Sequence, residues 1–209
     1  MPVTILRDDY AAWLDKVRPE LQKLGGMTIR VGVLGQEDGE LLMIANVHEF
    51  GATIRPSRAR NLAIPCSPRA RKAKPADFDD AFVWQDDSNP AVRWLVRPLP
   101  ENKLEFLYML VSQVTIPERS FIRASYDAKK DVLCRAVERA VGSVITGEIT
   151  AQQAADQIGN AAVGIVKRYM GTLAPPKSAI TLAADPRHNK PLMSSGRLRN
   201  SITYEVIWA

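Results

Sequence analysis

The chain has 209 residues, a hydrophobic content of 46%, a charged content of 24% and a net charge of +5. These values are ordinary for a globular protein that buries a core, either as one large domain or as one domain with a sizeable insertion. No window reaches the roughly 18 uncharged apolar residues of a membrane span. The first residues also lack the basic start and apolar middle of a signal peptide. The composition therefore excludes a membrane-embedded protein, and we expect synthesis in a cytoplasm.

The first quarter of the chain predicts a helix, a strand and a second helix. Apolar residues recur at three- and four-residue steps over residues 8–24, the period of a helix with one buried face. Residues 28–34 alternate as a strand does, and residues 35–39 supply a turn. A further helical segment ends at Gly51, for which we expect a left-handed backbone conformation with Phe50 buried beside it.

Prolines divide the following segment into short pieces that resemble strands. Between these prolines lie β-branched and aromatic residues, a pattern typical of strands bordered by turns. We predict strands at residues 62–64, 81–84, 93–96 and 104–116. The segment 55–116 is therefore predicted to be a β-rich insertion.

Two strong helices and a last strand follow the predicted insertion. The first helix covers residues 118–145 and is expected to start at Pro117. The second covers residues 151–170, where Thr150 and Gln153 fit a capping box and Gly171 ends the helix. Residues 172–195 hold four prolines and are predicted to form an extended arm, and residues 202–208 alternate as a strand.

These elements predict an α+β fold. A small antiparallel sheet, built from residues 28–34 and 202–208, is packed by two or three long helices. The core domain comprises residues 1–54 and 117–209, with the arm 172–195 inside it, and the β-rich insertion comprises residues 55–116.

The chain shows no pattern of catalytic or metal-binding residues. Cys66 and Cys134 have no partner spacing, and Cys134 falls on the apolar stripe of a predicted helix, which favours a reduced core thiol. Only His48 and His188 are left to complete a metal set, so we expect no metal site and no cofactor. No base is placed for the serines near residue 195, and turn or capping roles suit them better. We therefore expect a protein that is not an enzyme.

A run of basic residues without acids is the clearest feature of the charge distribution. Seven bases lie between Glu49 and Asp77, and five aspartates at positions 77, 79, 80, 86 and 87 follow. Such a pair of blocks suits contact between neighbouring copies or with a polyanion, and two solvated loops are an equal alternative. The basic residues are Arg55, Arg58, Arg60, Arg69, Arg71, Lys72 and Lys74.

Nucleic-acid binding is the main alternative function that this basic stretch raises. Seven bases are enough to neutralise several phosphates. However, few aromatic residues interleave with them to stack bases, and no recognised reading module is visible. We expect at most a non-specific, electropositive lining near packaged DNA.

Three phrases in the chain resemble a family of phage tail-completion proteins, also described as neck or head–tail joining proteins. They are ANVHEFGATI at residues 45–54, VTIPERSFIR at residues 114–123 and NKPLMSSGRLRNSI at residues 189–202. They occur in the family's order and, with the strands around them, span most of the chain. The chain departs from the family at residues 193–196, where an acid often precedes the Ser-Gly pair.

The resemblance implies a structural protein of a tailed phage or prophage that acts at the head–tail junction or the upper end of the tail. Its partners would be copies of itself in a ring, six-fold by analogy, together with connector proteins and the tail terminator or tail tube. It would be assembled in the host bacterial cytoplasm and kept in the virion. Residues near helix ends would supply the assembly interface through paired charges, and ion pairs within the chain or solvated arginines are the alternative interpretation. These residues are His48, Glu49, Arg119, Arg123, Arg197 and Arg199.

Overall fold

The computed structural model describes residues 9–34, 39–85, 92–173, 182, 192 and 195–209. The chain divides into two compact units. Unit 1 comprises Met1–Ala45, Ser120–Thr172 and Arg197–Ala209, and unit 2 comprises Asn46–Arg119 and Leu173–Gly196. Helices and small antiparallel sheets occupy different stretches of the sequence, so the predicted α+β fold is confirmed. The units divide at residues 45/46 and 119/120, whereas the predicted borders are 54/55 and 116/117.

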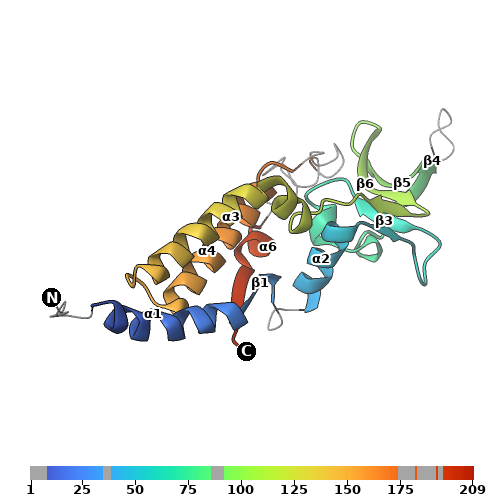
Figure 1. Cartoon of the computed structure of the whole chain (residues 1–209). Helices are drawn as coiled ribbons and strands as arrows, with labels where there is room; N and C mark the ends of the chain where they lie inside the picture. Colours follow the sequence, from blue (N-terminus) through green and yellow to red (C-terminus); the bar gives the residue numbers. More distant parts are fainter. Residues whose placement is uncertain (1–8, 35–38, 86–91, 174–181, 183–191, 193–194) are drawn as a thin grey trace, which may run out of the picture. The chain divides into compact units, whose positions relative to one another are not determined.

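Unit 1 combines long helices with the predicted two-stranded sheet. The strands β1 (Thr28–Val33) and β8 (Ile202–Ile207) pair antiparallel, with Thr28 opposite Ile207 and Val33 opposite Ile202 (Figure 1). Apolar residues of both strands alternate with exposed ones, which lets one face of this sheet pack on helices. The helices of unit 1 are α1 (Asp9–Gly26), α3 (Arg123–Ile145), α4 (Ala151–Met170) and the short α6 (Arg197–Asn200).

The core of unit 1 lies between α3, α4, α1 and β1. Ala140 and Val144 of α3 are buried against Ala154 and Ile158 of α4. The two alanines let the helices approach closely, and Val144 and Ile158 fill the space beside them. Half-buried residues of α1, β1 and their connection complete the cluster, namely Leu21, Leu24, Met27 and Ile29.

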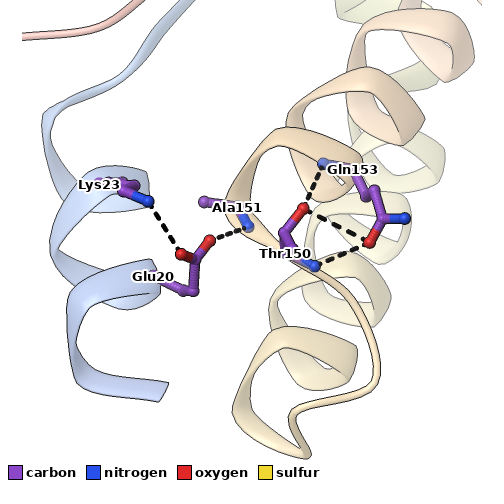
Figure 2. A network of polar contacts seen from close by, with 5 residues as sticks. All are labelled: Glu20, Lys23, Thr150, Ala151 and Gln153. Atoms are coloured by element: carbon purple, nitrogen blue, oxygen red, sulfur yellow. Dashed lines mark hydrogen bonds and ion pairs between the residues drawn. The ribbon is translucent and has the colours of Figure 1, made fainter. Parts of the chain in front are cut away.

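A polar network joins α1 to the start of α4 (Figure 2). The Thr150 hydroxyl accepts a hydrogen bond from the Gln153 amide, and the Gln153 side chain accepts one from the Thr150 amide, which confirms the predicted capping box. No local pattern indicates a third acceptor, the Glu20 carboxylate, which takes a hydrogen bond from the Ala151 amide at 2.7 Å. Lys23 lies 2.9 Å from the other Glu20 oxygen. A negative charge therefore lies at the positive end of the α4 dipole.

The helix α2 (Gly39–Phe50) ends as predicted, but its buried face differs from the prediction. Gly51 has φ +74°, the left-handed conformation that ends a helix. Leu41, Ala45 and Glu49 are buried at four-residue steps. Phe50 is 59% exposed. It follows the buried Glu49 by one residue, or about 100° around the helix, so the prediction that Phe50 is buried is wrong.

Unit 2 is built mainly from short antiparallel strands. Its larger sheet has four strands in the order β3-β6-β5-β4, and β2 and β7 form a separate pair. The strands are β2 (Ala52–Ile54), β3 (Leu62–Pro65), β4 (Phe82–Gln85), β5 (Arg93–Leu99), β6 (Lys103–Val111) and β7 (Val114–Ile116). The predicted strand at residues 104–116 is thus two strands, because the chain leaves the β3 partner after Val111 and pairs with β2 from Val114.

One face of the four-stranded sheet is covered by two short 3₁₀ helices, η1 (Ala70–Lys72) and η2 (Pro75–Asp77). Ala70 and Phe78 are buried against Leu107 and Tyr108 of β6. The Tyr108 hydroxyl lies 2.8 Å from the Ala70 carbonyl oxygen and 2.7 Å from that of Ala73. The Tyr108 hydroxyl therefore connects η1 to the sheet through hydrogen bonds. The basic residues of η1 are held in place with it.

The start of α3 and the position of Cys134 also differ from the predictions. The helix starts at Arg123 and not at Pro117, because the Arg119 amide donates to the His48 carbonyl and the Ser120 hydroxyl accepts from the Ala124 amide. Cys134 is exposed, so the predicted core thiol is wrong. The buried stripe of α3 runs through residues 133, 137, 140 and 144, one residue away from Cys134.

Two predicted segments, the turn at residues 35–39 and the arm at residues 172–195, lie almost wholly outside the described residues.

Candidate assembly surfaces

His48 and Arg119 are brought together in unit 2 at the end of α2. The Arg119 amide donates a 2.8 Å hydrogen bond to the His48 carbonyl. Two side-chain atoms in this pair, His48 Nδ1 and Arg119 Nε, are buried with no hydrogen-bond partner among the described residues. Burial lowers the pKa of His48 below its ordinary value, and the charge of Arg119 lowers it further, so the imidazole is neutral at pH 7. Glu49, the next predicted residue, is itself buried.

The other three predicted interface residues, Arg123, Arg197 and Arg199, belong to unit 1. Arg123 is exposed at the first position of α3. The Arg199 Nε donates to the Lys167 carbonyl at 3.3 Å in the last turn of α4. Arg197 lies 3.8 Å from Glu40. Arg197 and Arg199 thus have partners within the chain, and the six residues are divided between the two units.

The charged side chains of the basic stretch, residues 55–74 of unit 2, are all exposed. This holds for each of the seven predicted basic residues. The Arg55 Nε donates to the Gln113 side chain at 3.3 Å, and the Arg69 guanidinium lies 5.7 Å from the Phe78 ring centre. A cation over an aromatic face is attracted by the ring's quadrupole, which orders Arg69 above η2. The stretch therefore presents exposed positive charges on a folded unit.

The face of the four-stranded sheet opposite η1 carries an aromatic cluster, which we call the aromatic face. Its centre is Phe106, whose ring meets the rings of Trp84 and Trp94 edge-on, with centres 5.7 and 5.3 Å away. Trp84 lies directly opposite Trp94 in the ladder. Trp94 precedes Leu95, which packs on the η1 side, so the tryptophan points to the other face.

Large apolar side chains on this aromatic face are accessible to solvent. Phe82 is 45% exposed and Phe106 is 39% exposed, although both stand in a folded sheet. Leu104 lies two residues before Phe106 on the same face and is also exposed. An exposed apolar patch of this kind marks an interaction surface more often than an isolated surface residue does.

The aromatic face was not predicted from the sequence. The strands β4, β5 and β6 were recognised, but covered and open faces of a strand have the same alternating pattern. Only the position of η1 decides that Leu95 and Tyr108 are covered while Phe82 and Phe106 are not. The one sequence feature that could have indicated this face is the occurrence of large aromatic residues, Trp84, Trp94 and Phe106, in three successive predicted strands.

Unit 1 contains an open apolar groove of about 540 Å³ between β1, α3 and α4. Ile29 and Val31 of β1, with Ile165 and Val166 of α4, form its walls. Three charged residues of α3 also line it, namely Arg123, Asp127 and Lys129. The Lys129 backbone departs from helical geometry (φ −132°, ψ 19°) and kinks α3 at this groove. The lining of the groove is mainly apolar.

Neither a metal site nor a membrane span is found in the described part of the chain. No group of three or more histidine, cysteine, aspartate or glutamate side chains is placed to hold a metal ion there. None of the described helices combines the length and the apolar character that crossing a bilayer requires. Cys66 is half-buried, and burial raises the pKa of its thiol, which keeps it protonated at pH 7.

No protein-family model, curated protein or solved structure matches this chain.

Proposed function

We propose that the chain is a structural protein of a tailed bacteriophage or prophage particle. It acts at the head–tail junction or the upper end of the tail, as a building block that assembles with copies of itself into a ring. Connector proteins and the tail terminator or tail tube are its proposed partners. In this proposal it is a non-enzymatic component, assembled in the host bacterial cytoplasm.

The observation that carries the proposal is the aromatic face of unit 2. Phe82, Leu104 and Phe106 stand exposed on a sheet whose other face has its own core. Covering such a surface by a protein partner releases water from apolar area, the main favourable term in association. A role in assembly agrees with the three sequence phrases that resemble those of phage tail-completion proteins.

The basic stretch supports the same proposal as a second contact region. It is charged and exposed, and the acidic residues Asp77, Asp79 and Asp80, also exposed, follow it directly. Opposite charges presented by one folded unit steer identical copies into a head-to-tail arrangement, in which the positive region of one copy meets the negative region of the next.

A gene disruption tests the proposed function. A stop codon early in the gene, in a phage or induced prophage that carries it, should leave DNA-filled heads and separate tails but few complete virions. Supplying the chain from a plasmid should restore the complete particles. Normal numbers of infectious virions without the chain, or its absence from purified virions by mass spectrometry, would contradict the proposal.

Nucleic-acid binding is the second candidate, and the exposed basic stretch is the observation that favours it. Binding to single strands usually combines such charges with aromatic side chains in one groove. Here η1 covers one face of the sheet, and Trp84, Trp94 and Phe106 lie on the other. The charges of η1 and the aromatic rings therefore do not form one surface, which favours weak, non-specific contact with DNA.

A further inference from the structure

The two edge strands of the four-stranded sheet, β3 and β4, have no strand partner on their outer sides among the described residues. β4 reads Phe-Val-Trp-Gln, without charge, lysine or proline. Folded proteins usually protect a sheet edge with charged residues, prolines or bulges, because an open edge pairs with other strands. Val83, in the middle of β4, is 55% exposed. The β4 edge is therefore suited to pairing, whereas β3 offers the N–H of Ala63 but none at Pro65, its last residue.

We propose that β4 of one copy pairs antiparallel with β3 of the next, so that the four-stranded sheets of neighbouring copies join edge to edge. This inference rests on the proposed ring-forming function and names the surface that forms the ring. The strands of the sheet alternate in direction, and their number is even. The two edges therefore run in opposite directions, and a rotation about an axis along the strands brings them together antiparallel.

The backbone geometry fixes which residues of the two edges are able to bond. The Cys66 amide donates to the Leu107 carbonyl of β6. The backbone groups of every second residue face the same side of a strand, so the N–H and C=O groups of Ile64 and Leu62 also face β6. Ala63 then directs its N–H and C=O outward from β3. The same alternation can be followed through the paired residues of β6, β5 and β4. It shows that the N–H and C=O groups of Val83 face outward from β4.

The side-chain faces are compatible with a register in which Ala63 lies opposite Val83. Residues directly opposite one another across an antiparallel pair share a face of the sheet. Ile64 lies opposite Met109, which lies opposite Trp94, so Ile64 and Leu62 belong to the aromatic face. Pairing Ala63 with Val83 places Leu62 opposite Trp84 and Ile64 opposite Phe82. The exposed Phe82 would then gain an apolar neighbour, and the aromatic face would continue across the joint.

Charge complementarity supports a second copy as the occupant of the edge. Asp79 and Asp80 are exposed just before β4, and Arg69 and Lys72 are exposed shortly after β3. In the antiparallel pairing, the first residues of β4 in one copy lie beside the last residues of β3 in the next copy. The carboxylates of one copy would therefore meet the basic groups of the next.

Disulfide trapping tests the predicted pair directly. We would place Ala63→Cys and Val83→Cys in one chain from which Cys66 and Cys134 have been replaced by serine. Within a chain, three strand spacings of about 4.8 Å separate the two edges. A disulfide needs Cα atoms about 4.4–6.8 Å apart. Under mild oxidation we expect a ladder of covalent oligomers from the double variant, and monomers from each single-cysteine variant.

Each outcome of the trapping bears on the inference. Dimers from Val83→Cys alone would show that β4 pairs with β4 about a two-fold axis, and the β3–β4 joint would be wrong. The absence of a ladder at concentrations where light scattering detects oligomers would also overturn it. A chain that stays monomeric at every concentration overturns the joint as well. None of these results tests the proposed function. That proposal is tested separately, by the number of complete virions formed without the chain.

A charged substitution on the edge provides a second measurement. Val83→Lys should weaken self-association at least tenfold in sedimentation experiments, because a lysine opposes strand addition. Val83→Thr keeps a β-branched side chain and is the matched control, with an expected change of less than about threefold. Equal association of both variants would overturn the inference, and unchanged circular dichroism would exclude unfolding as the cause of any decrease.

Discussion

At the scale of single residues, one phenol holds η1, which carries Arg71 and Lys72 of the basic stretch, on its sheet. The Tyr108 hydroxyl lies within hydrogen-bond distance of the Ala70 and Ala73 carbonyl oxygens, and Ala70 is buried. Burial raises the pKa of Tyr108, and Asp77 raises it further, so the phenol keeps the proton that it donates. The position of η1 and its basic residues therefore depends on a residue of β6 that lies 38 positions after Ala70.

Tyr108→Phe removes this hydroxyl group, which is the donor to the Ala73 carbonyl, while the Ala70 carbonyl keeps the bond from the Ala73 amide at 3.4 Å. The cost of a buried unsatisfied polar group is about 1–3 kcal/mol. We expect a fall of that size in the free energy of unfolding, measured by urea denaturation. Tyr126→Phe is the matched control, since Tyr126 is exposed. Equal stability of the two variants would show that the Tyr108 hydroxyl adds nothing.

Glu20 is a second residue that acts far along the chain, and it makes stability depend on pH. The bond from the Ala151 amide lowers the pKa of Glu20, and Lys23 lowers it further. A carboxyl group whose pKa is lower in the folded state stabilises the fold fully above its ordinary value of 4.5. This contribution is lost as the pH falls through the lowered value.

Glu20→Gln should therefore melt at a lower temperature than the wild type at pH 7. The gap should close as the pH falls below about 4, because wild-type Glu20 then becomes neutral as well. Thermal melting followed by circular dichroism between about pH 7 and pH 3 measures both effects. The exposed Glu138→Gln serves as the control. A gap that is constant with pH would assign the effect to packing and not to charge.

The residues that sequence reasoning identified are those with local partners. Thr150 and Gln153 are three positions apart, so the pattern alone reveals their reciprocal bonds. Gly51 follows the end of a helical pattern and has the expected left-handed backbone. Glu20 and Tyr108 bond across 131 and 38 positions, and no local pattern indicates such a pairing.

At the scale of elements, α4 and β8 depend on a close approach at Gly159. A Cβ atom added there would overlap the Tyr204 ring. The Tyr204 hydroxyl donates to Asp156 on the same helix at 3.0 Å, which holds the ring in place. A glycine within a helix is otherwise unfavourable, so its position here has a packing reason.

Gly159→Ala should destabilise the protein although alanine favours the helix. Overpacking of this kind costs about 1–3 kcal/mol, which exceeds the gain of about 1 kcal/mol in helix propensity. Gly142→Ala, in α3, is the matched control because its added Cβ meets no atom within 4 Å. We expect the Gly142 variant to be more stable than the wild type and the Gly159 variant less stable, by chemical denaturation. The same sign for both would contradict this account of the packing.

The periodicity of apolar residues predicted the positions of most helices and strands. It gave wrong predictions where a segment changes the strand or helix against which it packs. The helices α1 and α4 and the strands β1 and β8 lie where the patterns predicted. The run from residue 104 to residue 116 is continuous in sequence, yet it serves two sheets. The apolar stripe predicted for α3 included Cys134, but the buried stripe passes through Leu133 and leaves Cys134 exposed. Neither error was avoidable from the local pattern, because both depend on which element lies alongside.

At the scale of the whole molecule, the two units carry different kinds of surface. Unit 1 presents an apolar groove, and unit 2 presents the aromatic face and the basic stretch. The residues selected from the sequence as one interface are divided between the units. The sequence phrases indicated a class of function, whereas the aromatic face depends on how the strands fold into a sheet.

The salt dependence of DNA binding distinguishes the two candidate functions. If the basic stretch contacts DNA only through phosphates, binding to duplex should be weak, independent of sequence and steeply reduced by salt. Replacing Arg58, Arg60 and Lys72 by glutamine should then lower the slope of log K against log salt by about 0.9 for each phosphate that is no longer neutralised. The measurement is fluorescence anisotropy with random duplexes between about 50 and 200 mM salt.

A matched triple variant separates a local site from the effect of net charge. Lys129, Lys130 and Arg135 are three exposed bases of α3 in unit 1, and their replacement by glutamine removes the same charge. An equal decrease in both triple variants would show that the basic stretch is not the site of binding. Far tighter binding to one sequence than to random DNA at physiological salt would contradict the virion proposal. In that case the steep, sequence-independent salt effect would no longer account for the affinity, and a specific nucleic-acid function would take its place.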